Sequence, residues 1–545
     1  MTDTQAPRRA LLSAYDKTGI VELAQALSEL GWELVSSGGT AEVIADAGLA
    51  VTPTSELTGF GDMLGHRVVT LHPLVHGGIL ADRNDDSHVA DMATHGITPI
   101  DLVAVNLYPF TSDPSVELLD IGGPTMVRAA AKNHEFVTVL VDPADYAPVL
   151  DEMRSNGEVS ALTRRRLARD AFAHTAAYDS AIVGWFDRGG EGGPGELPDR
   201  GALPPSVHLS ATRAQELRYG ENPHQHGARY TFSGDSCWDS AVQHGGKEMS
   251  FLNVYDADAA WRLVWSLGDD QPAAVVVKHA NPCGVAVADD ITTAYRRAHE
   301  CDPVSAFGGI VAVNRNVTHA MAEKLAPVFT EVLIAPGFDE DALLLLLEKR
   351  NLRVIEAAPP ASAVEVDGIG DGDMVIGIAG DGTPAVRFAE TPTPALDVRS
   401  VDGGLLVQTA DAVTIDRSAW EVVTERAPTD AEWADLELAW KVAARVTSNT
   451  IVLVKDGQAV GIGAGQQNRR DAGRIAADKA DGRAKGGACA SDAFFPFRDG
   501  LDAAAEAGAT AVIQPGGSIR DEEVIDAANE AGMAMVFTGE RHFKH

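Results

Sequence analysis

The chain has 545 residues, of which 79 are acidic and 44 basic, giving a formal net charge of −35 at pH 7. This length exceeds what one hydrophobic core organises, so we expect at least two domains. The negative charge opposes binding to nucleic acid and to anionic membranes, because repulsion acts before any contact forms. Any phosphate ligand therefore has to be held by local cations and backbone amides.

No segment predicts export or a membrane span. The stretch MTDTQAPRRALLSAYDK has no sustained apolar run, and nowhere do about 18 apolar residues follow one another. The four cysteines, Cys237, Cys283, Cys301 and Cys489, form no C-x-x-C pair, which indicates neither a disulfide framework nor a zinc site. We expect a cytoplasmic protein without nucleic-acid or membrane partners.

The first third of the chain alternates short apolar strands with helical patterns. LLSAY, WELVSS, DLVAVNLY and FVTVLV predict strands, and Ile20, Leu23, Leu27 and Leu30 have helical spacing. This alternation predicts an α/β domain with a largely parallel sheet. A helix is predicted over 162–185, and glycine and proline break all periodicity over 189–207. We therefore divide the chain into domains 1–200 and 201–545.

The second domain contains a weak internal repeat. VVVKHANPCGVAV is similar to IVLVKDGQAVGIG, and further landmarks follow in the same order. The paired landmarks are Lys278 and Lys455, Ser305 and Ser491, and Pro336 and Pro515. We expect two similar α/β subdomains, about 208–370 and 400–545. Residues 359–405, rich in Asp, Gly and Pro, predict a loop-dominated junction with a small hairpin.

A candidate phosphate site lies in VSSGGTAEVIADAG. This segment places Ser37, Gly38, Gly39 and Thr40 between a predicted strand and a predicted helix. Glycines let the backbone approach an anion, and the helix N-terminus and the hydroxyls supply donors. The alternative is a tight turn with an N-cap threonine.

Other polar residues are expected at the same sheet edge, because the carboxyl ends of parallel strands converge on one crevice. They are Ser13, Tyr15 and Lys17 upstream, and Arg67, Thr70, His72 and His76 in GHRVVTLHPLVHGG. The two histidines are four residues apart, but Pro73 argues against a helical metal site, so we expect structural hydrogen bonds.

Two further motifs complete an ordered set. NLYPF contains Tyr108, and DIGGPTMVRAAAKNH contains Asp120, Gly122, Gly123, Arg128, Lys132 and His134. Together with DKTG, SGGT, SELTGF and TLHP, they resemble the IMP cyclohydrolase domain of the bifunctional purine-biosynthesis family, whose fold is similar to methylglyoxal synthase. The resemblance covers about residues 9 to 195.

The resemblance implies ring closure of formyl-AICAR to IMP, with Lys132 transferring protons and Tyr108 and Asp120 orienting the reacting amide and formyl groups. Orientation of two groups already on one molecule is worth about 7 to 11 kcal/mol in favourable cases. The alternative interpretation is that Lys132 is a solvated surface lysine without a catalytic role. The implied substrate contacts are Tyr15, Asp16, Lys17, Ser37, Gly38, Gly39, Thr40, Arg67, Thr70, Val105, Asn106 and Ile121.

One position departs from the family pattern. Many members carry lysine in R-V-K-T-L-H-P, whereas this chain has Val69. We infer altered nucleotide contacts with cyclisation retained. The alternative is that the first domain is only a nucleotide-binding regulatory module.

In the second domain, Lys278 and His279 follow the apolar run AAVVV and precede ANPCG. A cation and an imidazole are therefore expected at the carboxyl end of a strand, which suits catalysis, although a KH pair is more often a surface pair. The ordered set LRYGENPHQ, KHANPCG, SAFGG, IAPG, SNTIVLVKDGQAVGIGAGQQNR, SDAFFPFRD and RHFKH resembles the AICAR transformylase domain. Its two subdomains resemble the cytidine deaminase fold, and the resemblance spans about 208–545.

The resemblance implies that His279 removes a proton from the 5-amino group of AICAR as this attacks the formyl group of 10-formyltetrahydrofolate, and that Lys278 stabilises the oxyanion. The two domains would then carry out the last two steps of IMP synthesis. The implied AICAR contacts are Arg218, Tyr219, Phe307, Gly308, Glu331, Asn449, Arg469, Asp499 and Arg541. The implied folate contacts are Arg470, Phe494, Ser518 and Ile519, although Phe494 could equally be a core residue.

No catalytic metal is expected. A deaminase-like zinc site needs H-x-E and P-C-x-x-C, but Ala286 stands where the second cysteine would follow Pro282 and Cys283. We interpret Cys283 as a small buried thiol rather than a nucleophile. A monovalent cation is left open, and the family resemblance implies a homodimer with transformylase sites between subunits. A non-enzymatic acidic scaffold would rest on net charge alone and would not explain either motif set.

Overall fold

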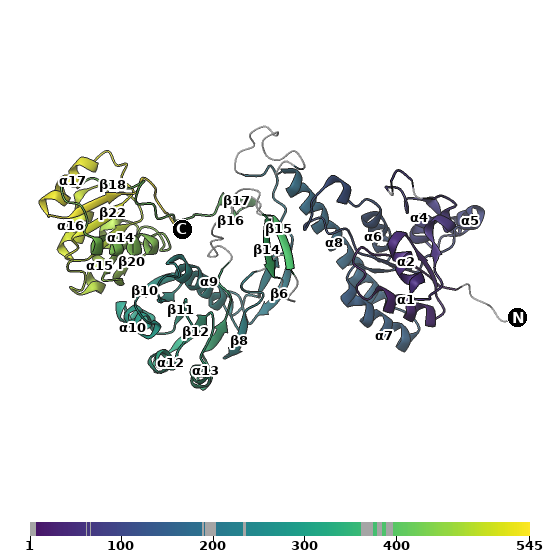
Figure 1. The fold of residues 1–545 in the computed structure, drawn as a ribbon, viewed down its shortest axis with the longest axis horizontal. Helices are drawn as coiled ribbons and strands as arrows, with labels where there is room; N and C mark the ends of the chain where they lie inside the picture. The colour runs from purple at the N-terminus through teal and green to yellow at the C-terminus, as the bar shows by residue number, and fades with distance from the viewer. Residues whose placement is uncertain are drawn as a thin grey trace. The chain divides into compact units, whose positions relative to one another are not determined.

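The chain folds as two units, Met1–Ser210 and Ala211–His545, shown in Figure 1. The computed structural model describes residues 7–61, 63–65, 67–187, 190, 203–232, 236–360, 374–378, 384–388 and 396–545. Most of the predicted boundary segment 189–207 lies outside these residues. Among the helices of the described residues, none is long and apolar enough to cross a membrane.

A five-stranded parallel sheet forms the centre of the first unit, in the order β3-β2-β1-β4-β5. The strands are β1 Arg9–Ser13, β2 Glu33–Ser36, β3 Thr52–Pro53, β4 Leu102–Val105 and β5 Thr138–Leu140. The helices are α1 Ile20–Glu29, α2 Gly38–Asp46, α3 Thr54–Thr58, α4 Pro73–Leu80, α5 Asp86–His95, α6 Gly122–Lys132, α7 Tyr146–Asn156 and α8 Ala161–Asp187, with short 3-10 turns at Val116–Leu118 and Pro143–Asp145.

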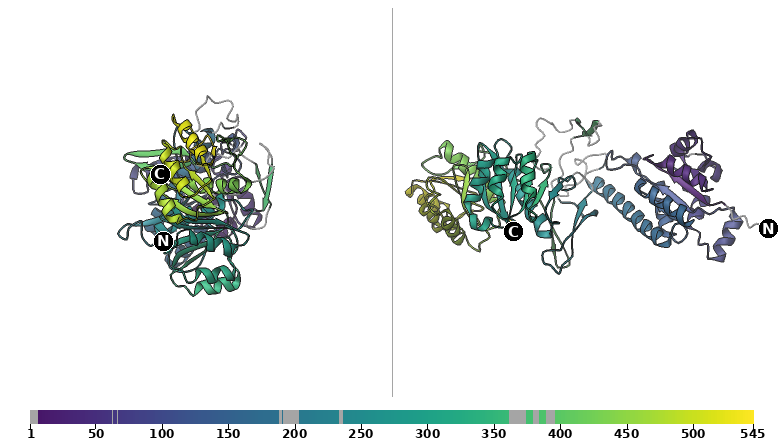
Figure 2. Two further views of the ribbon diagram at one scale, coloured as in Figure 1. Left: turned by 90° about the vertical axis from the view of Figure 1, so that its left-hand side faces the viewer. Right: turned by 90° about the horizontal axis from the view of Figure 1, so that it is seen from below.

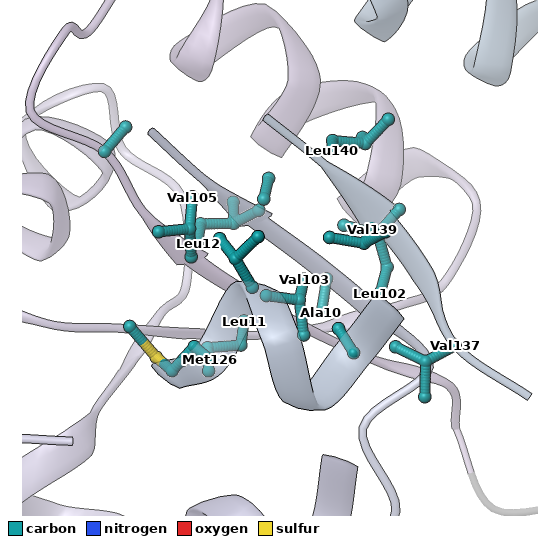
Figure 3. Packing of buried hydrophobic residues seen from close by; sticks show 14 of the residues in the cluster. Ala10, Leu11, Leu12, Leu102, Val103, Val105, Met126, Val137, Val139 and Leu140 are labelled. Carbon is teal, nitrogen blue, oxygen red and sulfur yellow. The ribbon is translucent and has the colours of Figure 1, made fainter. Parts of the chain in front are cut away.

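The central strands are continuous apolar runs because both of their faces are covered. Leu11 and Leu12 on β1 and Val103 on β4 are completely buried, and Figure 3 shows them packed together with Met126 of α6. The predicted helical spacing is confirmed for Ile20, Leu23 and Leu27, which are buried on α1. It is wrong for Leu30, which caps the end of α1 and is 40% exposed. Helix α8, the long blue helix of Figures 1 and 2, agrees with the helix predicted over 162–185.

The second unit is built on a twelve-stranded sheet of order β18-β23-β22-β21-β19-β20-β10-β9-β11-β12-β13-β8. Its strands are β8 Val242–Gly245, β9 Ala273–Lys278, β10 Asn281–Val287, β11 Gly309–Val313, β12 Thr330–Ala335, β13 Arg353–Glu356, β18 Glu421–Val422, β19 Ile451–Lys455, β20 Gln458–Gly463, β21 Ala488–Ser491, β22 Ala511–Gln514 and β23 Ala534–Phe537. The order is symmetric about the β10–β20 pair, so each half of the sheet repeats the other.

Helices cover both faces of this sheet. The first half carries α9 Phe251–Ser266, α10 Ile291–Cys301, α11 Pro303–Ala306, α12 His319–Leu325 and α13 Glu340–Leu347, and the second half carries α14 Asp430–Ala443, α15 Arg469–Ala480, α16 Arg498–Glu506 and α17 Asp521–Glu530. Alternate strand residues point to opposite faces. Val275 and Val277 therefore join one core that runs through both halves and contains Trp261 of α9 and Trp440 of α14. On the other face each half has its own core.

The predicted repeat is largely confirmed. Lys278 and Lys455 each end the first strand of a hairpin, β9–β10 and β19–β20, and Pro336 and Pro515 each follow a corresponding strand, β12 and β22. The predicted pairing of Ser305 with Ser491 is wrong. Ser305 lies in α11 before β11, whereas Ser491 ends β21, because a match of a few similar letters does not fix register.

Three hairpins stand outside the large sheet: β6 Ala211–Leu217 with β7 Gly227–Phe232, β14 Met374–Ile378 with β15 Pro384–Phe388, and β16 Leu396–Val401 with β17 Gly404–Thr409. The junction predicted over 359–405 thus contains hairpin structure, and its remaining residues 361–373, 379–383 and 389–395 lie outside the described part of the chain.

Candidate active sites

The first candidate site lies where the order of the parallel sheet reverses, between β1 and β4, at the carboxyl ends of the strands. Here the hydroxyls of Ser13 and Ser37 are 2.8 Å apart. Thr40 is buried, accepts from the amide of Ala14 at 3.1 Å and donates to the Ala14 carbonyl at 2.9 Å. The predicted convergence of SGGT on the end of the first strand is therefore found.

The cap of α2 differs from the alternative considered from sequence. Ser37, not Thr40, is the N-cap residue, and its hydroxyl makes no capping bond. Gly38 has a φ of 49°, in the left-handed region that favours glycine. The first turn of α2 thus presents Gly38 and Gly39 as exposed backbone with unpaired amides, which is the geometry that suits an anion.

Asn106 fixes the loop that follows β1. Its side-chain oxygen accepts from the amides of Tyr15 at 2.6 Å and Asp16 at 3.0 Å, and its amide nitrogen donates to the Asp16 carbonyl at 2.8 Å. The ammonium of Lys17 folds back onto the carbonyls of Ala14 and Tyr15. These sequence-predicted residues, together with Val105 at the end of β4, therefore form one wall of the crevice.

Tyr108 lies beside Tyr15 of this loop, and Asp120 lies close to Tyr108. Burial raises the pKa of Asp120, although backbone amides, including that of Gly123 at 2.8 Å, stabilise its ionised form. Burial also raises the pKa of Tyr108, and the charge of Asp120 adds to this rise. The ring of Tyr108 meets that of Tyr15 edge-on, with centroids 5.5 Å apart. The structure thus brings together an acid with perturbed ionisation and a phenol.

Arg67, Thr70 and Ile121 lie beside the N-terminus of α6. A Cβ at Gly122 would lie 2.9 Å from the Thr70 hydroxyl, which shows how closely the two segments approach. Arg67 is exposed and ion-paired with Glu117. Ile121 is 62% exposed, so its side chain is free to cover a ligand at the mouth of the crevice.

The structure does not bring Lys132 into this crevice within one chain. Asp120 and Gly122 lie at the start of α6 and Lys132 is its last residue, about 15 Å further along the helix axis at 1.5 Å per residue. Lys132 instead lines a separate pocket of about 640 Å³ with His76, Arg128, Arg165, Arg169 and Phe172. The motif had suggested proximity because its residues are close in sequence.

The two histidines of TLHPLVH do not act as a pair. His72 is the N-cap of α4 and its Nδ1 accepts from the amide of Leu74 at 3.2 Å, which confirms a structural hydrogen bond. Nε2 of His76 has no hydrogen-bond partner among the described residues, and burial lowers the pKa of His76.

The second candidate site follows one edge of the twelve-stranded sheet. The strand directions place the carboxyl end of β9 at the same sheet edge as the first residues of β11, β12 and β13. The carboxyl ends of β20, β21, β22 and β23 lie at this edge too, and so does the first residue of β19, which runs in the opposite direction to these four strands. The sequence-predicted residues along this edge are Gly308, Lys278, His279, Glu331, Asn449, Arg469, Asp499, Ser518, Ile519 and Arg541.

Lys278 and His279 occupy the expected place at the end of a strand. Lys278 is the last residue of β9, and its ammonium donates to the carbonyls of Phe307 at 2.9 Å and Gly308 at 3.1 Å. His279 and Ala280 form the two-residue turn to β10, both with positive φ. The His279 side chain is exposed, so the imidazole is available to a substrate.

This part of the site is completed by three residues that the sequence motifs did not indicate: Asp256, Asn253 and Arg353. Asp256 on α9 accepts from the Ala280 amide at 2.9 Å, and burial raises the pKa of its carboxyl. Asn253 donates to Glu331 at 2.8 Å, and Arg353 approaches the same carboxylate at 3.8 Å. Arg218 and Tyr219 contact each other through a hydrogen bond of 2.8 Å. The only available signal for Asp256 is that Asp435 occupies the same place in the repeat.

A second cluster lies in the other half of the unit. Arg469 donates to Ser491 at 3.2 Å and to Asp492 at 3.1 Å, and Asp492 is completely buried. Ser448 donates to the other carboxylate oxygen at 2.5 Å. Asn449 exchanges two backbone hydrogen bonds with Gln466. Asp492 was not predicted, yet it is the counter-charge that fixes a predicted phosphate-binding arginine.

The C-terminal segment RHFKH closes over this cluster. The Phe543 ring lies under the guanidinium groups of Arg541 at 4.6 Å and Arg469 at 5.8 Å. His542 is buried and hydrogen-bonded to Asp411 at 2.9 Å. The C-terminal segment thus meets the predicted Arg469 in space.

Three of the predicted folate contacts, Phe494, Ser518 and Ile519, lie on loops after β21 and β22, and Arg470 is exposed in the first turn of α15. Phe494 is 36% exposed and Ile519 fully exposed, so neither is a core residue. The amide of Ser518 donates to Asp521 at 3.1 Å.

The cysteines and the carboxylates give no metal centre among the described residues. Cys283 is buried, its thiol contacts the carbonyl of Val276 at 3.5 Å, and burial raises its pKa to about 12. A thiol in this state is a poor nucleophile, which agrees with its interpretation as a packing residue.

Comparison with known families shows to which family the chain belongs. The MGS-like domain model matches residues 19–134, and the model described as AICARFT/IMPCHase bienzyme matches residues 130–376 and 385–479, more than half of the chain. The chain belongs to the AICARFT/IMPCHase bienzyme family. Family membership is independent of the geometry above, and both point to nucleotide chemistry in each unit.

Relatives cover the whole chain. The bifunctional purine biosynthesis proteins PurH of Cereibacter sphaeroides and Roseobacter denitrificans are each 49% identical to it, over 100% of both chains. PurH of Bacillus cereus is 47% identical over 99% of this chain and 100% of its own. A solved structure titled "Crystal structure of ForH" is 39% identical, covers 33% of this chain and 96% of its own, and has a TM-score of 0.31.

As a bienzyme of this family, the chain carries AICAR formyltransferase and IMP cyclohydrolase activities, the last two steps of purine biosynthesis. Its N-terminal part is MGS-like with a parallel sheet. An acidic scaffold without catalysis is therefore excluded.

Proposed function

We propose that the first unit closes the ring of formyl-AICAR in the crevice between β1 and β4. The exposed amides of Gly38 and Gly39, with the adjacent hydroxyls of Ser37 and Ser13, are suited to the 5′-phosphate. Tyr108 and Asp120 then face the base end of the nucleotide, where they orient the carboxamide nitrogen toward the formyl carbon. The observation that carries this assignment is the pairing of Asp120 and Tyr108, each with a raised pKa, in the crevice.

Having Val69 where many relatives have lysine is not expected to prevent cyclisation in this arrangement. Val69 is half-buried next to Thr70, and Arg67 and Lys17 remain as cations near the crevice. The proposal therefore keeps cyclisation and expects weaker phosphate binding than in relatives with lysine there. A regulatory module without catalysis would have no use for the buried carboxyl of Asp120.

The family resemblance proposes Lys132 as a proton-transfer residue, but α6 holds it out of hydrogen-bond reach of Asp120 in the same chain. For Lys132 to serve the reaction, a second copy of the chain has to supply it. We therefore expect a homodimer in which each crevice is completed in trans. Mixing Lys132→Ala chains with Asp120→Asn chains tests this, because heterodimers would regain one intact crevice.

Three results of that mixing experiment can be told apart. Recovery of a substantial fraction of wild-type cyclisation supports the trans arrangement. No recovery, with both variants inactive alone, contradicts it. If Lys132→Ala alone has full cyclisation activity, Lys132 takes no part in the mechanism and is a solvated surface lysine.

We propose that the second unit transfers the formyl group at the β9–β10 turn, with 10-formyltetrahydrofolate as co-substrate. His279 is exposed at the turn and takes the proton of the 5-amino group as this attacks the formyl carbon. Lys278 stabilises the developing oxyanion, since its ammonium is already held at the same strand end. As the bond from the amine to the formyl carbon forms, the bond from that carbon to N10 of the folate breaks, and the proton taken by His279 is returned to N10. Tetrahydrofolate then leaves, so no covalent enzyme intermediate is needed.

The substrate contacts are distributed over two clusters. Arg218, Tyr219, Gly308 and Glu331 belong to the first half of the sheet, and Asn449, Arg469, Asp499 and Arg541 to the second. Glu331 lies on β12 and Asp499 follows β21, and six strand spacings of about 4.8 Å, or about 29 Å, separate these strands along the edge. The nearer members of the two clusters meet at the β9–β10 turn, where Lys544 of the C-terminal segment donates to the Ala280 carbonyl. A transformylase site shared between subunits would accommodate the outer positions, with Arg470, Phe494, Ser518 and Ile519 receiving the folate.

A coupled assay with AICAR and 10-formyltetrahydrofolate tests both halves of the proposal. His279→Ala is expected to lower the rate of formyl transfer by about 10² to 10⁴-fold, as for loss of a general base. The variant should still close added formyl-AICAR to IMP. Asp120→Asn is expected to make formyl-AICAR and to accumulate it. If His279→Ala transferred formyl at the wild-type rate, the assignment of the base would be wrong. His319→Ala, at an exposed position on α12, is the matched control.

A further inference from the structure

The turn that carries His279 has a backbone conformation that its sequence does not favour. The φ angles of His279 and Ala280 are 53° and 55°, in the left-handed region that glycine and asparagine adopt most readily. Two-residue hairpins with both residues there are typically Asn-Gly or Asp-Gly. The repeat supplies the comparison, because the equivalent β19–β20 turn is Asp456-Gly457, with φ angles of 50° and 74°.

Side chains from distant segments hold the His279 turn. Asp256 of α9 accepts from the Ala280 amide at 2.9 Å. Asn281 donates to the His279 carbonyl at 3.2 Å. The ammonium of Lys544, in the C-terminal segment, donates to the Ala280 carbonyl at 3.2 Å and to the Arg445 carbonyl at 3.0 Å. In the second half the Gly457 carbonyl accepts from the backbone amide of Val287 at 2.9 Å, so no side chain is needed for that carbonyl.

Lys544 is itself held in place. Its carbonyl accepts from the amide of Ser448 at 2.8 Å. His542, two residues before Lys544, is hydrogen-bonded to Asp411 and packs edge-on against Trp440 with ring centroids 5.3 Å apart. The amide of His542 also donates to the Asp492 carbonyl at 3.2 Å. Lys544 therefore connects the turn to a fixed point and not to a mobile end.

We propose that Lys544 is a positioning residue for formyl transfer. By holding the Ala280 carbonyl it fixes the peptide plane that follows Ala280, and so the backbone of the turn that carries the His279 imidazole next to the Lys278 ammonium. Lys544 need not touch either substrate. The inference rests on the proposed role of His279 as the base and gives a role to a residue of RHFKH to which the family resemblance assigned none.

The expected effect is a loss of turnover without a loss of binding. Lys544→Met removes the ammonium and keeps most of the apolar stem. We expect kcat for formyl transfer to fall about 10- to 100-fold, since small misplacements of a reacting group have effects of this size, and KM for AICAR to stay within about twofold of wild type. Lys544→Arg, which also donates to carbonyls, is expected to restore most of kcat.

The matched control is Lys441→Met. Lys441 on α14 makes the same kind of bond, to the Leu267 carbonyl at 3.1 Å, but is not connected to the turn. It is expected to leave kcat unchanged. The fluorescence of Trp261 and Trp440, which lie in the core of the second unit, reports whether that unit is folded in each variant. If Lys544→Met folds poorly, Lys544→Gln, which is shorter but keeps a donor, should give an intermediate kcat.

The outcomes separate this inference from the proposed function. If His279→Ala abolishes transfer but Lys544→Met and Lys544→Gln keep wild-type kcat, the positioning role is refuted and the base assignment stands. A raised KM with normal kcat would also refute it, because the segment would then serve substrate binding alone. If His279→Ala retains transfer, the proposed function itself fails, whatever the Lys544 variants do.

Discussion

Glu432 is expected to be one of the most important single charges for the stability of the second unit. Its carboxylate accepts from both terminal nitrogens of Arg426 at 2.8 and 2.9 Å, from the Thr510 hydroxyl at 2.6 Å and from the Thr429 amide at 2.8 Å. Burial alone would raise the pKa of Glu432, but these hydrogen bonds outweigh it and lower the pKa from 4.5 to about 2. A shift of this size corresponds to about 3 kcal/mol of stability at neutral pH.

The perturbation is Glu432→Gln, measured by urea denaturation with the fluorescence of the tryptophans of α14. Because the folded pKa lies below the unfolded one, the stabilisation is present above about pH 4.5 and is lost as the pH falls toward 2. The variant should therefore be about 3 kcal/mol less stable than wild type at pH 7 and equal to it near pH 2. Glu437→Gln, on the same helix and paired with the half-exposed Arg417, should cost under about 1 kcal/mol. A Glu432 effect that does not change with pH would refute the reasoning.

Further expectations concern the two active sites. Gly123→Ala would place a methyl group 2.3 Å from Oδ2 of Asp120, so we expect loss of cyclisation with normal formyl transfer, followed as IMP formed from added formyl-AICAR. Because burial raises the pKa of Asp120, its ionised form disappears at a higher pH than for an ordinary aspartate, and cyclisation should fall as the pH drops through that raised value; an unchanged acid limb in Asp120→Asn would argue against it. Asp492→Asn leaves Arg469 buried without its counter-charge, and should raise KM for AICAR at least about tenfold and cost about 3 to 5 kcal/mol of stability. A normal KM would separate Arg469 from phosphate binding.

The strands and helices with strong periodicity were predictable from the sequence. β1, β2, β4 and β5 coincide with apolar runs that both faces of a parallel sheet require, and α1 and α8 follow helical spacing. β3 was missed because Thr52 and Pro53 are exposed and form no apolar run. The sheet order and the continuity of twelve strands through both repeats depend on pairings between distant segments, which no local pattern encodes.

The candidate sites were predictable where a motif keeps its residues on one loop, as with Ser37 to Thr40 and with Lys278 and His279. They were not predictable where a single polar side chain reaches across the fold. Asp256, Ser448 and Lys544 find their partners 24, 44 and 264 residues away. The opposite error arises for Lys132, where closeness in sequence to Asp120 becomes separation along the axis of α6.

The core that contains Trp261 and Trp440 runs without a break from one repeat into the other, while the strands at the seam, β10 and β20, share the bridge pair of Ala286 with Gln458. A fragment that ended in the junction between the repeats would therefore leave a broad apolar surface in water. The halves are copies in topology but not autonomous folding domains, and the second unit is expected to denature in one cooperative step.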